Sequence, residues 1–209
     1  MTKDLDTESR ILEAAKRVFI RKGYAGARMQ EIADEAGINK GLLHYYFRNK
    51  DNLFGAIFEE AFRELAPRTV EIFESDEPLF TKLEQFIDRY LDFLAERPYL
   101  PAFVIQEINN NPEGLLKKLA ESGFQPNPMK LFIQIQMEIQ KGNIRPVNPI
   151  HLVVNLISMC VFPFVGRPML QQILQVGDAE YLEFMKMRKE VILDFVKNAI
   201  LEEGGGSRE

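Results

Sequence analysis

The amino-acid sequence predicts an all-α protein: a small N-terminal domain of three helices, then a larger helical domain, about nine helices in all. Apolar side chains recur at the i, i+3 and i+4 spacing along most of the 209-residue chain, which is typical of helices with one buried face. Pro, Gly and Asn residues separate these stretches. The alternation of apolar and polar residues between hairpin turns that marks β-strands is missing.

The first helix is predicted to begin at Thr7, a suitable N-cap, and to end at Gly23. Its buried face at helical spacing consists of Ile11, Ala15, Val18 and Phe19. The polar residues 1–6 are expected to be frayed. Tyr24 is expected to pack in the small core formed with the next two helices.

Residues 28–47 contain two short amphipathic patterns on either side of a tight turn. The first pattern consists of Met29, Ile32, Ala33 and Ala36, and the second of Leu42, Leu43 and Phe47. Gly37 stands where the first helix must end with a positive φ, and Asn39 is a good N-cap for the second. Such a pair is a helix-turn-helix, whose second helix can enter the major groove of DNA.

An ordered set of residues makes this part of the chain resemble a known family. Residues 11–54 are similar to the DNA-binding domain of the tetracycline-repressor (TetR) family of bacterial transcription regulators. The matching positions are the ILEAA sequence of residues 11–15, Phe19, Gly23, Tyr24, Ile32, Ala33, Ala36, Gly37, Ile38, Lys40, Gly41, Tyr46, Phe47, Lys50 and Leu53. The rest of the chain resembles the family in length and helical character.

The resemblance implies that the second helix of the motif reads DNA. Contacts with the DNA backbone are expected from Lys40, Tyr45, Tyr46 and Lys50. The residues expected nearest the bases are Gly41, Leu42 and His44. Gly41 would let the helix approach closely, and Leu42 would touch a thymine methyl group. A dimer would place two such helices in successive major grooves, roughly 34 Å apart, on a near-palindromic operator.

Two positions depart from the family pattern. Arg28 stands where many members have the Thr or Ser that caps the second helix, so that cap is either missing or replaced, although an arginine can still reach a phosphate. His44 stands where members usually have a tyrosine. Its ring is either packed or solvated without a role in DNA binding, or it forms a hydrogen bond to DNA. In the second case affinity should rise as falling pH protonates the imidazole.

A long helix is expected from Lys50 to Phe73, kinked or split by Pro67. In the family this helix links the DNA-reading head to the body. The later helices are predicted at residues 79–96, 99–109, 113–121, 129–141, 151–174 and 178–201, with loops at 123–128 and 146–149. Pro163 and the sequence Gly166-Arg167-Pro168 interrupt the helix of residues 151–174.

The predicted domains are a DNA-binding domain at residues 1–49, a ligand-binding and dimerisation domain at residues 50–203, and a disordered tail at residues 204–209. Apolar side chains of the last helix spread over more than one face, which favours burial against a second chain. In the family the last two long helices form a four-helix bundle with their symmetry mates. A homodimer through these helices is therefore expected.

Aromatic and methionine side chains are frequent in the helices of the larger domain. Each is either an ordinary core residue or part of a cavity for an apolar or aromatic ligand of drug or lipid size. The candidate cavity residues are Phe86, Tyr90, Phe93, Phe103, Gln106, Met137, Met159 and Phe164. Tyr90 and Gln106 would orient the ligand, an unidentified small-molecule effector.

The charges are distributed unevenly, although the net charge is −5. Residues 1–50 carry ten Lys or Arg and seven Asp or Glu residues, whereas the remainder carries sixteen and twenty-four. A slightly basic head on an acidic body suits a protein that meets DNA at one end only.

Several other classes of protein are disfavoured. His44, His151 and Cys160 are the only His and Cys residues, so we expect no metal site and no disulfide, and Cys160 should be an inert buried thiol. Neither a glycine-rich phosphate loop nor a GxSxG motif is present, so we expect no catalytic residue and no cofactor. Because no signal sequence and no run of ~18 apolar residues occur, we expect a cytoplasmic protein without membrane contact.

The sequence therefore predicts a homodimeric transcriptional regulator, and more specifically a repressor that a ligand releases from its operator. Two alternatives stay open. One is an all-α small-molecule-binding protein, or an enzyme on this scaffold, that no longer reads DNA. The other is a DNA-binding regulator controlled by a protein partner. Only a DNA reader would show steep salt dependence of DNA binding, which separates the first alternative from the others.

Overall fold

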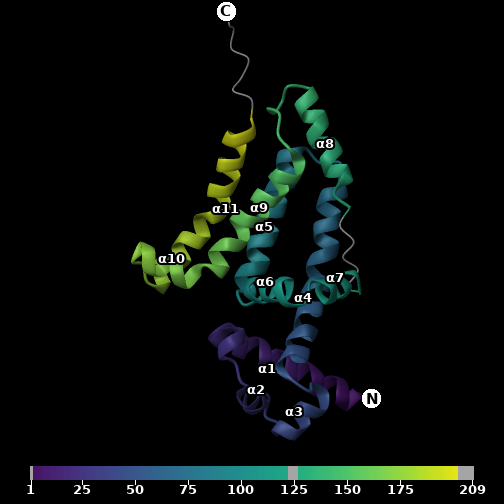
Figure 1. Ribbon diagram of the computed structural model, residues 1–209, viewed down its shortest axis with the longest axis vertical. Coiled ribbons are helices and arrows are strands. Elements are labelled where there is room, and N and C mark those ends of the chain that lie inside the picture. The colour runs from purple at the N-terminus through teal and green to yellow at the C-terminus, as the bar shows by residue number, and fades with distance from the viewer. Residues whose placement is uncertain (1, 122–126, 202–209) are drawn as a thin grey trace, which may run out of the picture. The chain divides into compact units, whose positions relative to one another are not determined.

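The computed structural model describes residues 2–121 and 127–201, and these residues form helices with a single isolated bridge between Ile144 and Leu201. The helices in order are α1 (Thr2–Gly26), α2 (Met29–Ala36), α3 (Lys40–Tyr46), α4 (Lys50–Glu74), α5 (Leu79–Glu96), α6 (Leu100–Asn110), α7 (Pro112–Glu121), α8 (Met129–Gln140), α9 (Pro149–Val165), α10 (Arg167–Leu174) and α11 (Asp178–Ile200) (Figure 1). The predicted all-α class is confirmed. The described residues form eleven helices, more than the predicted number of about nine, and α10 is the one that was predicted as part of a longer helix.

The first helix differs from its prediction at its start, because it begins at Thr2 instead of Thr7. Its predicted end at Gly23 is a break in the structure, where the φ of 66° and ψ of 173° are not helical, and a further helical turn reaches Gly26. Residues 2–6 contain neither Pro nor Gly, so nothing in them ends the helix before Thr7. The predicted tail at residues 204–209 and most of the predicted loop at residues 123–128 lie outside the described residues.

Two predicted interruptions have opposite outcomes. Helix α4 is not split at Pro67 and runs without a break from Lys50 to Glu74, because a single missing N–H does not end a helix whose neighbouring turns are intact. By contrast, the helix predicted at residues 151–174 is two helices, α9 and α10, which are bent by 75° at Gly166. The proline next to Arg167 cannot continue the hydrogen bonding of α9 but fits the first turn of a new helix.

Contacts divide the chain into two compact units. The first comprises Met1–Ala66 and Arg97–Gln125, and the second comprises Pro67–Glu96 and Pro126–Glu209. This division falls inside α4, whereas the functional division after residue 49 stays a prediction. Among the described residues no single helix has the length and apolar composition needed to cross a membrane, although the bent pair α9 and α10 has them when the two are taken together.

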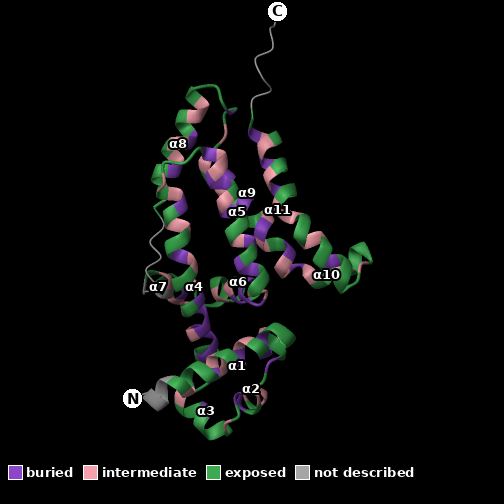
Figure 2. Ribbon diagram, turned by 180° about the vertical axis from the view of Figure 1, so that it is seen from behind, coloured by how far each residue is buried: buried purple, intermediate pink, exposed green. Residues whose placement is uncertain are grey.

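The first unit is built around α1, α2 and α3, with aromatic rings in its core. The predicted apolar face of α1 is buried, and so are Ile32 and Ala33 of α2 and Leu43 of α3 (Figure 2). Phe54 of α4 packs its ring against Phe19 at 4.8 Å and against Phe103 of α6 at 4.0 Å between centroids. This core holds α2 and α3 in a fixed arrangement.

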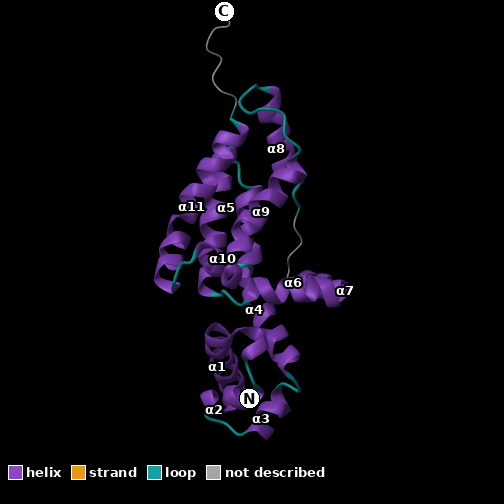
Figure 3. Cartoon of the chain, turned by 60° about the vertical axis from the view of Figure 1, so that its left-hand side comes forward, coloured by secondary structure: helices purple, strands orange, loops and turns teal. Residues whose placement is uncertain are grey.

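The second unit is a bundle in which α5, α9 and α11 lie side by side, with α8 against α5 and α9 (Figure 3). Its core contains Leu83, Phe86, Ile135, Leu156, Cys160, Ile192 and Val196, all of them buried. The helices α9 and α11 also expose apolar side chains, which are described below.

Candidate nucleic-acid interface

The turn between α2 and α3 has the geometry expected of a helix-turn-helix. Gly37 adopts φ 66° and ψ 36°, the left-handed conformation. Its N–H donates to the Asp34 carbonyl at 3.1 Å, and the N–H of Ile38 donates to the Ala33 carbonyl at 3.0 Å. In addition, Nη2 of Arg10 donates to the Ala36 carbonyl at 2.7 Å. The last carbonyls of α2 are therefore satisfied, and the turn is rigid.

Asn39 caps α3 as predicted, since its Oδ1 accepts a hydrogen bond from the N–H of Leu42 at 2.8 Å. A Cβ atom at Gly41 would lie 3.2 Å from the same Oδ1. The structure thus gives Gly41 a second role beside its predicted approach to DNA, because a larger residue there would press on the cap.

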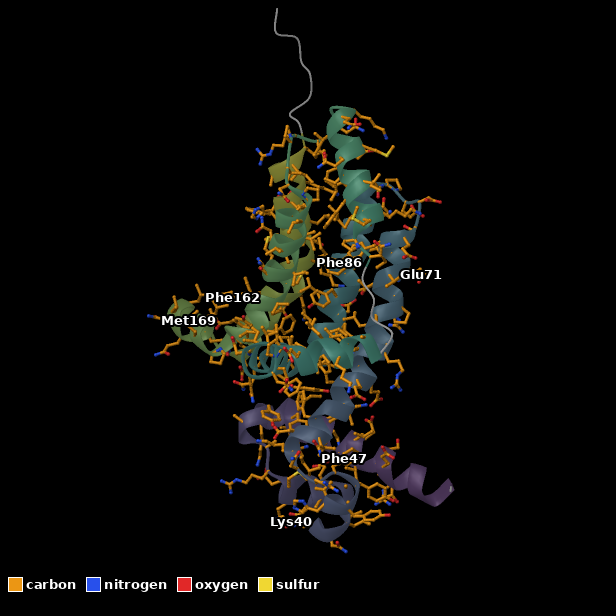
Figure 4. All side chains as sticks on the ribbon, turned by 45° about the vertical axis from the view of Figure 1, so that its right-hand side comes forward. Lys40, Phe47, Glu71, Phe86, Phe162 and Met169 are labelled. Carbon is orange, nitrogen blue, oxygen red and sulfur yellow. The ribbon has the colours of Figure 1, made fainter. Side chains whose placement is uncertain are left out.

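The solvent face of α3 carries the side chains that were predicted to meet DNA. Lys40, Leu42, His44 and Tyr45 are exposed, with Tyr45 81% and Leu42 37% accessible. Lys40 is labelled at the start of α3 in Figure 4. Tyr46 is half-buried, and its ring packs edge-on against Tyr45 at 5.5 Å between centroids. A short helix that presents an ammonium, a phenol and an imidazole suits a groove lined with phosphates.

The imidazole of His44 has a defined orientation. Its Nδ1 lies 2.9 Å from the carbonyl oxygen of Arg48. Because a carbonyl only accepts hydrogen bonds, Nδ1 carries a proton in both the neutral and the charged ring. Protonation therefore changes Nε2 from an acceptor to a donor, and only the donor form can bind a phosphate oxygen.

Arg28 precedes α2 in an extended conformation and forms no side-chain cap, so of the two predicted outcomes, a missing or a replaced cap, the first is confirmed. Glu31 lies in the first turn of α2 instead. A hydrogen bond from Lys22 and, to a smaller extent, the backbone N–H of Arg28 hold the pKa of the Glu31 carboxyl below its usual value. The guanidinium of Arg28 is exposed, and its charge also contributes to the lowered pKa of Glu31.

Two of the three carboxylates of α2 are paired with α1, whereas Asp34 accepts a hydrogen bond from Gln30 of its own helix. Glu35 accepts hydrogen bonds from Arg17 at 2.8 Å and from Arg21 at 2.7 Å, and these two bonds lower the pKa of its carboxyl. Glu31 accepts one from Lys22 at 2.6 Å. These ion pairs offset two of the acidic charges that would otherwise repel DNA near α3.

Lys50, a predicted contact to the DNA backbone, also makes contacts within its own chain. Its Nζ donates to the carbonyls of Tyr24 at 2.8 Å and Ala27 at 3.2 Å, and it lies 4.4 Å from the centroid of the Tyr24 ring. Lys50 therefore ties the start of α4 to the loop before α2. A contact to DNA stays a prediction, and it would use the remaining N–H of the ammonium.

Arg48 is a basic residue of this surface that the sequence pattern did not single out. It is exposed, and its carbonyl orients His44. Within the described part of the chain, neither Lys40 nor Arg48 takes part in an ion pair. The four-residue spacing from His44 was the signal available for Arg48.

The predicted ligand residues fall into different surroundings. Phe103 and Gln106 belong to the first unit, where Phe103 is buried among Phe54, Tyr24 and Phe58 and Gln106 is exposed. In the second unit Phe86 and Phe93 are buried, Tyr90, Met159 and Phe164 are half-buried, and Met137 is exposed. Their role in binding a ligand stays a prediction.

Phe86 and Tyr90 stack with ring centroids 5.2 Å apart, and Phe86 also contacts Phe73. Burial raises the pKa of the Tyr90 hydroxyl, which therefore stays protonated. The exposed Met137 instead belongs to a shallow groove of about 470 Å³ that also includes Met129, Ile133 and Ile150. The second unit thus holds aromatic rings in its interior and an apolar groove on its surface.

Comparisons with known proteins point to one family. Residues 11–57 match the family described as bacterial regulatory proteins, tetR family. A helix-turn-helix transcriptional repressor of Streptomyces coelicolor is 42% identical over 94 residues, which cover 45% of each chain. The chain thus spans less than half the length of that relative.

Solved structures share the fold over nearly the whole chain. HlyIIR, a hemolysin II transcriptional regulator, superposes with a TM-score of 0.59 at 21% identity and covers 95% of this chain and 98% of its own. The regulator FadR of Bacillus subtilis, in complex with stearoyl-CoA, gives a TM-score of 0.58 at 19% identity, with 90% and 96% covered. At these identities the likeness concerns the fold alone.

Proposed function

We infer, from the premise that this chain belongs to the tetR family of bacterial regulatory proteins, that it is a transcriptional regulator which binds double-stranded DNA through α3. The observation that carries this inference is the exposed face of α3, which presents Lys40, His44 and Tyr45 from a rigid turn. The carboxylates of Glu31 and Glu35 on the neighbouring α2 are already paired with α1. As a reader of chromosomal DNA, the protein would work in the cytoplasm.

The proposed contacts follow the chemistry of each side chain. Lys40 and Arg28 would bind phosphates by charge, and Tyr45 and Tyr46 through their hydroxyls. Leu42 and Gly41 lie on the first turn of α3, the end that approaches base edges in helix-turn-helix proteins. His44 would contact a phosphate or a base next to them.

The active species would be a homodimer through α9 and α11. Each of these helices has a solvent-exposed apolar stripe at helical spacing in addition to its buried face. The stripes consist of Ile150, Val154 and Ile157 on α9, and of Met187, Val191 and Phe195 on α11. A helix in a monomer needs only one apolar face, so these stripes favour a bundle with a second copy. Two-fold symmetry would then require a near-palindromic operator.

The proposal also covers whether the protein represses or activates transcription, and which ligand controls it. We propose a repressor, as the Streptomyces coelicolor relative is. The effector would be an apolar or aromatic small molecule held beside Phe86, with the protonated hydroxyl of Tyr90 as its hydrogen-bond donor. The stearoyl-CoA in FadR makes long-chain acyl compounds the first class to examine. Coupling of ~1–3 kcal/mol would weaken operator binding ~5–150-fold.

The test of DNA reading is selection from a pool of random duplexes by the purified protein at two salt concentrations. We expect an enriched near-palindrome with half-sites about one helical turn apart, and an affinity that falls steeply with salt. Lys40→Ala should weaken binding, whereas Lys186→Ala, which removes an exposed charge from α11, should not. A folded protein that enriches no sequence would instead support a ligand-binding protein without DNA recognition.

The ligand is tested on the selected operator. Stearoyl-CoA, free fatty acids and planar aromatic compounds are titrated into the complex while DNA release is measured. A releasing compound should lose potency against Tyr90→Phe, which keeps the ring and removes the donor. If the compound acts equally on Tyr90→Phe, Tyr90 is not the orienting group.

A further inference from the structure

Helix α10 has its apolar side chains on the outside. No residue of this eight-residue helix is buried, and Met169, Ile173 and Leu174 are 49%, 66% and 52% exposed. Figure 2 shows it with exposed and half-buried positions only. Figure 4 labels Met169 and also Phe162, an exposed aromatic residue near the end of α9. The second unit does not bury this apolar face, so its burial would require another molecule.

The polar face of α10 is turned toward its own chain. Nη2 of Arg167 donates to the Asp178 carboxylate at 2.7 Å, and Nε2 of Gln171 donates to the same oxygen at 3.0 Å. The Arg167 guanidinium also lies 5.4 Å from the Tyr181 ring centroid. These contacts attach α10 to the first turn of α11.

Helical spacing puts the apolar residues on the side of α10 opposite these polar contacts. Arg167 and Gln171 are four residues apart and share one face, while Met169 and Ile173 share the face across the helix. An amphipathic helix of a monomeric protein does the reverse, burying its apolar face and exposing its polar one. The hydrogen bonds of Arg167 and Gln171 to Asp178 thus hold α10, called the arm below, with its apolar face toward solvent. Because the arm is already positioned, a partner that binds this face loses less conformational entropy on association.

We propose that this arm packs against a second copy of the same chain and extends the dimer interface beyond the stripes of α9 and α11. The inference rests on the proposed homodimer. The argument for a second copy is continuity, because α10 follows α9 directly and leads into α11. The ring of the exposed Phe162 lies beside Gly166, where α10 begins, since a Cβ added there would lie 3.1 Å from it. Stable interfaces use about 20–30 residues a side, more than two narrow helical stripes supply.

A lipid surface fits the arm less well than a second copy does. Helices that lie on membranes carry Lys and Arg on their polar face to meet anionic headgroups. The one cationic residue of α10, Arg167, forms an ion pair with Asp178, and the remaining polar side chains of the helix are Gln171 and Gln172. Without free positive charge this face has no electrostatic attraction to an anionic bilayer.

The proposal is tested with the double variant Met169→Glu/Ile173→Glu in the full chain. Both positions are exposed, so folding should be retained, as circular dichroism would check. Sedimentation equilibrium should show the dimer dissociation constant raised tenfold or more. The matched control is Gln172→Glu, which adds a carboxylate to the same helix outside the apolar face and should change the constant by less than threefold.

A second variant separates this proposal from the homodimer itself. Val191→Glu on the α11 stripe should produce monomers whether or not the arm contributes. If Val191→Glu gives monomers and the α10 variant dimerises like the wild type, the arm proposal is overturned while the homodimer stands. If the wild type is already monomeric, both are overturned. Binding to phosphatidylglycerol vesicles that Met169→Glu/Ile173→Glu abolishes, with dimerisation unchanged, would also overturn it in favour of a lipid surface.

Discussion

The Nη2 of Arg188 in α11 donates a hydrogen bond of 3.1 Å to the carbonyl oxygen of Met159 in α9. Met159 lies four residues before Pro163, so this carbonyl is the one that the missing N–H of Pro163 leaves without an intrahelical donor. A second bond, from the Tyr181 hydroxyl to the Pro163 carbonyl at 2.7 Å, joins the same two helices. Thus α11 compensates for the proline of α9.

Arg188→Met should lower the free energy of unfolding by about 1–3 kcal/mol, because it leaves the Met159 carbonyl unpaired. Urea denaturation measures the loss. In a Pro163→Ala background the helix supplies its own N–H to Met159, so the same substitution should cost about 1 kcal/mol less. Equal costs in both backgrounds would show that Arg188 stabilises the protein by other contacts.

Gly37→Ala should destabilise the protein by about 1 kcal/mol, because the residue has a φ of 66° that an L-residue rarely adopts. Steric crowding would not contribute, since the nearest atom to an added Cβ is Nη2 of Arg10 at 3.6 Å. Gly26→Ala is the control, as Gly26 has no positive φ. Thermal unfolding of the two variants should differ, and equal midpoints would contradict the argument.

Lys40 and Lys50 should respond differently to substitution by Met. Lys40→Met removes an exposed charge, so it should reduce the slope of log affinity against log salt by about 1 and leave unfolding unchanged. Lys50→Met also removes the bonds to the Tyr24 and Ala27 carbonyls, so it should lower the unfolding free energy by about 1.5–3 kcal/mol. A Lys50 variant of full stability would mean that these bonds do not hold the loop.

Cys160 should be inert toward thiol reagents in the folded protein. Its side chain is fully buried, and desolvation raises the pKa of the thiol to about 12. The thiolate that reacts is therefore scarce near neutral pH. Labelling with a chromogenic disulfide should proceed only as fast as the second unit unfolds, and should accelerate with urea along the unfolding transition. Rapid labelling of native protein would contradict this burial.

Local patterns were sufficient for most of the DNA-reading motif. The left-handed Gly37, the Asn39 cap and the uncapped start of α2 at Arg28 depend on neighbours within a few residues. Such contacts are determined by the sequence of the segment itself. The boundaries of α5, Leu79–Glu96, were likewise predictable, because Pro98 ends the apolar repeat shortly after it.

Contacts between distant segments were not predictable in this way. The hydrogen bonds of Lys50 go to carbonyls more than twenty residues earlier in the chain. The burial of Phe103 depends on aromatic rings of α1 and α4. Aromatic residues of a core and of a ligand site have the same composition and spacing. Periodicity therefore could not distinguish them for Phe103.

By itself the sequence determined the helical class, the helix-turn-helix and the residues that α3 exposes, because these follow from helical periodicity and local capping. Only the tertiary structure decided that α1 forms ion pairs with Glu31 and Glu35 of α2, that Arg188 donates a hydrogen bond to the carbonyl left unpaired by Pro163, and that α10 turns its polar face inward. Each of these depends on side chains brought together from different helices, and a hydrogen bond or ion pair forms only where packing sets the distance.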